Sequence, residues 1–205
     1  MECLVGLALS LVLVAPLIKN SGEFIAKQIQ YEKSYSLAAE ADRALELIGR
    51  AIRMAGYRNA KTSIASIRKN SSSSDDMQIQ KSSGYRGSDS LTVKYEISQG
   101  VDFDCIGNIL SKERTKNNLA LQGFLVDRQA SAAKGAKVNG GSLICQSLDR
   151  QGRIQNTTLM NGVHHLSFEA LPASAGKALK VKLEMTDGVS IHQDFERIFA
   201  TRNLL

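Results

Sequence analysis

Tryptophan is absent from the sequence, and Tyr and Phe bring the aromatic fraction to only 5%. Proteins that hold nucleic-acid bases usually stack them on aromatic rings, so this scarcity argues against a stacking platform. The chain also lacks a Gly-x-Ser-x-Gly elbow, an HExxH helix, a P-loop and a dinucleotide fingerprint. We therefore expect no catalytic residues, no enzyme activity, no cofactor and no small-molecule substrate.

Histidine and cysteine are scarce as well, with three of each in the chain. No cysteine has the spacing or the histidine partners of a zinc site. His164 and His165 are adjacent, so on a strand their side chains would point to opposite faces and could not share one metal ion. We expect no metal site.

The cysteines differ in their surroundings. Cys3 lies in an apolar run, whereas Cys105 and Cys145 lie in the polar, strand-rich part of the chain. If that part is exported, a disulfide between Cys105 and Cys145 is expected, and it would stabilise the fold by roughly 4 kcal/mol. The alternative is two free, buried thiols in a cytosolic protein.

Charge of one sign is not concentrated anywhere in the chain. The net charge is +6, but the Lys and Arg residues are scattered among 20 acidic ones. A nucleic-acid-binding protein usually gathers its cations into a patch or stripe. We expect no nucleic-acid partner, and a weak attraction to DNA or anionic lipid is the alternative.

The amino terminus carries an uncharged apolar run from Cys3 to Ile18. This run is slightly shorter than the ~20 residues of a transmembrane helix. A signal peptide fits less well, because only Met1 and Glu2 precede the run and no good cleavage site follows it. We interpret residues 1–18 as a transmembrane segment.

Helical periodicity continues beyond this run. Residues 19–56 are amphipathic, with charged residues on the remaining faces and Gly56 at the position of a left-handed helix cap. We predict one helix for membrane insertion and assembly over residues 1–56. Its apolar stripe consists of Leu37, Ala41, Ala44, Leu45, Ile48, Ala51, Ile52 and Ala55.

The rest of the chain divides into a connection and a strand-rich domain. Residues 57–87 are rich in Ser, which predicts an exposed connection. Residues 88–205 contain two clean alternations of apolar and polar residues, at 90–97 and 179–185. We predict a periplasmic antiparallel β domain whose apolar face is covered by the helix stripe, in an α+β fold.

Short motifs along the chain resemble one known family. Met1 to Leu9 is similar to the start of a mature type IV pilin, with Glu2 in place of the glutamate that leads into the pilin helix. The basic leader, its final glycine and the following phenylalanine are not in the sequence, so processing by a prepilin peptidase is an inference from the resemblance. Further segments are similar, in order, to landmarks of the PilW-type minor pilins: Ala51–Tyr57, Gly87–Tyr95, Asp104–Gly107, Asn161–Val163 and Arg202–Asn203.

The resemblance implies a pilin-like ladle, with the long helix as its handle and the sheet as its bowl. It also implies a minor pilin of the type IV pilus that helps to initiate assembly by packing its helix against other minor pilins and the major pilin. Glu2 would meet the amino terminus of a neighbouring subunit, while Gly6, Ala8 and Ser10 would allow close helix approach. The implied location is the inner membrane, with the domain in the periplasm, and then the pilus on the cell surface.

Two other functions stay open at this point. The first is a J-class pseudopilin of a type II secretion system, which shares the expected architecture. The second is a membrane-tethered adhesin or DNA-binding module whose helix serves only as an anchor. Neighbouring genes would distinguish the first, and the salt dependence of DNA binding would distinguish the second.

Overall fold

The structure is a computed structural model that describes residues 2–58, 76–98, 100–116, 119–129, 140–173 and 176–203. Up to residue 17 it describes the backbone, with a side chain at Val14, and from Ile18 onward it describes the side chains of these ranges except at 173, 176 and 177. The chain divides into two compact units, Met1–Ser36 and Leu37–Leu205. Each unit is described by itself below.

A single helix, α1 (Glu2–Met54), accounts for the amino-terminal part of the chain. The helix ends just before Gly56, the residue that we predicted as its cap. Gly56 has a φ of +73°, and its N–H donates to the carbonyl of Lys94. Glycine adopts this left-handed conformation at little cost, which explains why the helix stops here. The peptide of Gly56 thus connects the end of α1 to the sheet.

No helix within the described ranges has both the length and the apolar composition that crossing a membrane requires. The transmembrane segment that we predicted at residues 1–18 is therefore wrong, and so is the bitopic inner-membrane location that depended on it. The physical reason is length, because the uncharged run from Cys3 to Ile18 is shorter than ~20 residues and Lys19 follows it directly.

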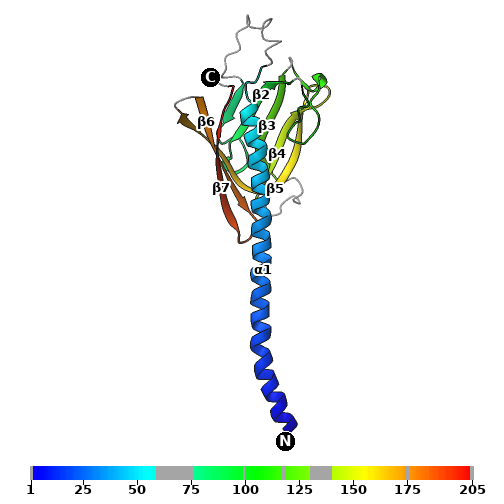
Figure 1. Ribbon diagram of the computed structural model, residues 1–205, viewed down its shortest axis with the longest axis vertical. Coiled ribbons are helices and arrows are strands. Elements are labelled where there is room, and N and C mark those ends of the chain that lie inside the picture. The colour runs from blue at the N-terminus through cyan, green and yellow to red at the C-terminus, as the bar shows by residue number, and fades with distance from the viewer. Residues whose placement is uncertain are drawn as a thin grey trace, which may run out of the picture. The chain divides into compact units, whose positions relative to one another are not determined.

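Seven strands follow the helix and form one sheet, in which each strand pairs antiparallel with the next along the chain. Figure 1 shows these strands in the part of the chain that follows α1. Two short 3-10 helices, η2 (Tyr85–Gly87) and η3 (Lys112–Arg114), lie in the connections. The strands are β1 (Met77–Gln80), β2 (Ser90–Glu96), β3 (Leu119–Arg128), β4 (Gly141–Leu148), β5 (Ile154–Ala173), β6 (Gly176–Thr186) and β7 (His192–Ala200).

The predicted α+β class is correct, but the predicted pilin-like ladle is wrong. The strands make a large seven-stranded sheet in consecutive order, which is not the bowl of a ladle. The reason lies in β5, which is a single strand of 20 residues. Its first half pairs with β4 and its second half with β6, so that it joins all the strands into one sheet.

The core of the second unit lies between the sheet and the last turns of α1. Leu91, Val93 and Tyr95 of β2 are at most 2% exposed, while the alternating residues of that strand are half-buried. Each large apolar side chain buried in this way stabilises the fold by roughly 1.5–3 kcal/mol. The helix contributes the predicted stripe, of which these residues are buried: Ala41, Ala44, Leu45, Ile48, Ala51, Ile52 and Ala55.

Candidate functional site

The residues that we predicted for assembly all belong to α1. Glu2, Gly6, Ala8 and Ser10 lie within its first turns, where the structure describes the backbone and not the side chains. Their predicted contacts with other subunits therefore stay a prediction. The described side chains of the first unit begin further along the same helix.

Large apolar side chains of the first unit are exposed to solvent. Six of them, between residues 18 and 35, have exposed fractions from 49% to 72%: Ile18, Phe24, Ile25, Ile29, Tyr31 and Tyr35. Scattered exposed apolar residues are ordinary on a protein surface, but a run of them along one helix is typical of an interaction surface. We call these six residues the exposed helix face.

The spacing of these residues places them on one broad side of α1. Residues four and seven positions apart lie above one another on a helix, which aligns Ile18, Ile25 and Ile29 in one row. Phe24, Tyr31 and Tyr35 form a second row by the same spacing, about 120° around the helix from the first. Gln28 and Glu32 lie between the two rows, and Nε2 of Gln28 donates to Oε1 of Glu32 at 3.2 Å. This spacing is visible in the sequence alone, although the apolar stripe that we predicted began only at Leu37.

The opposite side of this part of α1 is charged. Lys19, Glu23 and Lys27 follow one another at four-residue steps and are all exposed. A Glu followed by a Lys four residues later stabilises a helix by about 0.2–0.5 kcal/mol. The first unit thus has one charged side, and a second side on which two apolar rows flank the polar pair Gln28 and Glu32.

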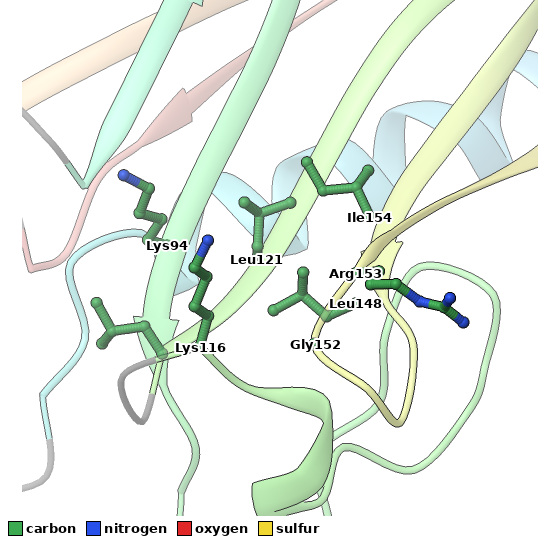
Figure 2. Close-up of a pocket in the computed structure, with 8 residues that line it drawn as sticks. Lys94, Lys116, Leu121, Leu148, Gly152, Arg153 and Ile154 are labelled. Carbon is green, nitrogen blue, oxygen red and sulfur yellow. The ribbon is translucent and has the colours of Figure 1, made fainter.

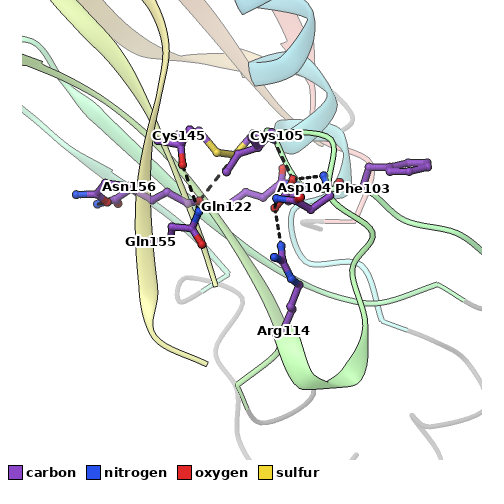
Figure 3. The surroundings of a disulfide bond; sticks show 12 residues. Phe103, Asp104, Cys105, Arg114, Gln122, Cys145, Gln155 and Asn156 are labelled. Atoms are coloured by element: carbon purple, nitrogen blue, oxygen red, sulfur yellow. Dashed lines mark hydrogen bonds and ion pairs between the residues drawn. A yellow bond between two sulfur atoms is a disulfide. The ribbon is translucent and has the colours of Figure 1, made fainter. Parts of the chain in front are cut away.

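A disulfide joins the loop before η3 to the sheet. The structure contains the bond that we expected between Cys105 and Cys145, whose Cα atoms are 6.1 Å apart. Cys145 lies in the middle of β4 and is buried. Figure 3 shows that the bond holds the segment around Cys105 against the strands.

Asp104 gives the same loop a second anchor. Its Oδ1 accepts the backbone N–H groups of Ile106 and Asn108 at 3.0 and 2.8 Å, and its Oδ2 accepts from Arg114 at 3.1 Å. The carboxylate is fully buried, so these bonds replace the water that it loses. Phe103, the preceding residue, points away from the sheet in Figure 3 and is 39% exposed.

A groove of about 550 Å³ lies on the sheet face opposite the helix stripe. Its floor is apolar, and Figure 2 shows Leu121, Leu148 and Ile154 side by side on neighbouring strands. Lys94 and Lys116 both line the groove at one end, whereas Arg153 points away and donates to Asp149 at 2.9 Å. An apolar floor beside two cations has the chemistry to accept an apolar group that carries negative charge.

Asp89 bonds to the second half of β5, on the side away from β6. Its backbone N–H donates to the carbonyl of Leu166 at 2.8 Å, and its Oδ2 accepts the N–H of Phe168 at 2.9 Å. The ammonium group of Lys81 donates to both this carboxylate and the Phe168 carbonyl. Burial alone would raise the pKa of the Asp89 carboxyl, but the bonds from Lys81, Phe168 and Ser82 outweigh burial and hold this pKa below its usual 3.8.

The histidines are arranged differently from our expectation. We considered His164 with His165, but the structure brings His164 next to His192 of β7, with ring centroids 5.3 Å apart in an edge-on arrangement. The guanidinium of Arg86 lies 3.3 Å from Nδ1 of His164. Within the described ranges no three His, Cys, Asp or Glu side chains gather as a metal site would require.

Comparisons of the chain with protein-family models, with curated proteins and with solved structures identified no match. The resemblance to pilins therefore depends on the short motifs of the sequence. The function that these motifs imply is a proposal, and the exposed helix face is the structural feature that bears on it.

Proposed function

We propose that this chain is a minor pilin of the type IV pilus, of the PilW type, which helps to initiate pilus assembly by packing its amino-terminal helix against the helices of other pilins. The observation that carries the proposal is the exposed helix face, from Ile18 to Tyr35 of α1. The ordered set of pilin-like motifs in the sequence supports the same function.

A helix with such a surface needs a partner. An isolated helix in water is only marginally stable, because no packing of its apolar side chains offsets the conformational entropy that the chain loses when the helix forms. Residues 1–36 form a unit of their own, and the six large side chains of the exposed helix face remain in contact with solvent. Packing on a second helix of similar pattern would bury both apolar sides at once.

The roles of the first residues follow from the resemblance. Glu2 would pair with the amino terminus of a neighbouring subunit and so fix the axial register between helices, since a slip of one residue would separate the two charges. Gly6, Ala8 and Ser10 would let the helices approach closely because their side chains are small. Other minor pilins and the major pilin are the proposed partners.

The proposal is tested by placing a charge on the exposed helix face. In Ile25→Lys the new ammonium group would have to be buried against the partner helix, so we expect assembled filaments per cell, counted by electron microscopy, to fall severalfold. Gln30→Lys adds the same charge on the other side of α1 and is the matched control. Equal filament numbers in Ile25→Lys and the unaltered protein would contradict the proposed function.

A further inference from the structure

The sheet has an open edge in its middle as well as at its two ends. The first half of β5 pairs with β4 on one side, but pairing with β6 begins only at Val163. Among the described residues, no backbone group bonds to the other side of β5 between Ile154 and Gly162. Figure 1 shows this part of β5 beside β4.

The hairpin between β4 and β5 shows which backbone groups face this open side. The carbonyl of Arg153 accepts the N–H of Asp149 at 2.8 Å and therefore points toward β4. In an antiparallel ladder successive residues direct their N–H and C=O groups to alternate sides. The N–H and C=O groups of Ile154, Asn156 and Thr158 therefore point to the open side, where another extended backbone could replace water and bond to all of them.

The other two edges are protected against such pairing, whereas this one is not. β1 has only four residues, and the outer strand β7 contains Asp194, Glu196 and Arg197. Short strands and charged side chains are the usual means by which proteins prevent edge pairing. Between Ile154 and Gly162, β5 contains no charged residue and no proline.

Irregularities in β5 limit the part of the edge that can pair. The register with β4 shifts so that Leu159 and Gly162 have no partner residue, and both positions are bulges. The stretch from Ile154 to Thr158 is free of shifts. Ile154 is 61% exposed, and Asn156 and Thr158 are exposed as well.

We propose that a second copy of this chain pairs with this edge, antiparallel, through residues 154–158 of both copies. A two-fold axis would pass through Asn156, so that Ile154 of one copy lies opposite Thr158 of the other. With the axis at Asn156, every outward backbone group of the three residues has a partner in the second copy. The two sheets then become one continuous sheet across the dimer.

The side chains of this stretch favour a second copy over an unrelated strand. Across the axis Asn156 lies opposite Asn156 and Gln155 lies opposite Thr157, and each of these side chains carries both a donor and an acceptor. No pair of like charges meets across the axis, because the stretch has no charge. The pairing uses no residue of α1 and is therefore independent of the proposed pilin function.

A charge exchange at Asn156 tests the pairing, because this residue would face itself across the axis. The full chain is studied by sedimentation velocity in a nonionic detergent that covers the exposed helix face. We expect the unaltered chain to form dimers, and Asn156→Lys and Asn156→Glu each to reduce the dimer population by roughly fivefold or more, since like charges would face each other. Mixing the two variants should restore dimers that contain one copy of each.

Ile198→Lys, on the exposed outer edge of β7, is the matched control and should dimerise like the unaltered chain. Thermal unfolding followed by circular dichroism checks that every variant is folded. A monomeric unaltered chain, or dimers that persist in Asn156→Lys, would overturn the proposal. Failure of the mixture to form mixed dimers would overturn it as well, because a strand other than β5 of a second copy would then occupy the edge.

Discussion

The carboxylate of Asp89 accepts the backbone N–H of Phe168 at 2.9 Å, although 79 residues separate the two in the chain. The pairing of β5 with β4 ends at Val163, so on this side the buried backbone at Phe168 would otherwise have no partner. The side chain of Asp89 and the ammonium group of Lys81 together take the place of a neighbouring strand. This contact allows one long strand to belong to both halves of the sheet.

Removal of this carboxylate should destabilise the sheet strongly. In Asp89→Ala the N–H groups of Phe168 and Ser82 lose their acceptor, and the former is buried. Leaving such groups without a partner costs a few kcal/mol, and we expect the free energy of unfolding to fall by about 3 kcal/mol. Urea unfolding measures this change. A loss below ~1 kcal/mol would show that water can replace the carboxylate.

The same carboxylate should make stability depend on pH. Its pKa is lower in the folded chain than the usual 3.8, so the folded state binds fewer protons than the unfolded state in this region. The stabilisation of the fold by the ionised Asp89 carboxylate is therefore complete above pH 3.8, and it is lost as the pH falls through the lower pKa of the folded chain. Asp89→Asn cannot titrate, so its unfolding free energy, measured against pH, should decline less steeply in acid. Identical slopes would contradict this assignment.

Gly49 should resist substitution, although glycine is a poor helix former. A Cβ at this position would overlap the ring of Phe199 on β7. The higher helix propensity of alanine would raise the free energy of unfolding by about 1 kcal/mol, but displacing the ring would lower it by about 1–3 kcal/mol. We therefore expect urea unfolding to show that Gly49→Ala is destabilising or neutral.

The smaller side chain in Phe199→Leu should make room for the methyl group, so that Gly49→Ala becomes stabilising in that background. Gly22→Ala is the matched control, because nothing lies within 4 Å of a Cβ there and only the gain in helix propensity remains. Its helix content, followed by circular dichroism, should rise. Clear stabilisation by Gly49→Ala alone would show that the ring moves freely.

Cys105→Ser and Cys145→Ser should destabilise the second unit equally, since each removes the same bond. The bond closes a loop with a sequence separation of 40, and the chain-entropy model gives about 4 kcal/mol for such a loop. Urea unfolding with and without reductant measures the loss. Unequal effects of the two substitutions, or no effect of reductant on the unaltered chain, would contradict a stabilising role of the bond.

Local patterns in the sequence predicted the parts of the fold that depend on neighbours along the chain. The alternation around Leu91, Val93 and Tyr95 predicted β2, and Gly56 predicted the end of α1. The bulges at Leu159 and Gly162 have no such signal, because they arise where β5 passes from one partner strand to the next. The sheet was therefore larger and more continuous than the pattern suggested.

The candidate site could be predicted in part. The disulfide followed from two cysteines in the strand-rich region, and the row of Phe24, Tyr31 and Tyr35 is apparent from its spacing. The bond between Asp89 and Phe168 could not be predicted, because a single acidic residue before a strand gives no indication of a partner so distant in the chain.

Crosslinking from the exposed helix face tests most directly whether α1 packs against the helices of other pilins. A photoreactive amino acid replaces Ile25 in one variant and Glu23 in a second; residues two positions apart lie on nearly opposite sides of a helix. Filaments are irradiated, and the crosslinked peptides are identified by mass spectrometry. We predict that the probe at position 25 joins the amino-terminal helix of another pilin and that the probe at position 23 does so severalfold less. Equal crosslinking from the two positions, or no crosslink to a pilin helix from position 25, would contradict the proposed packing.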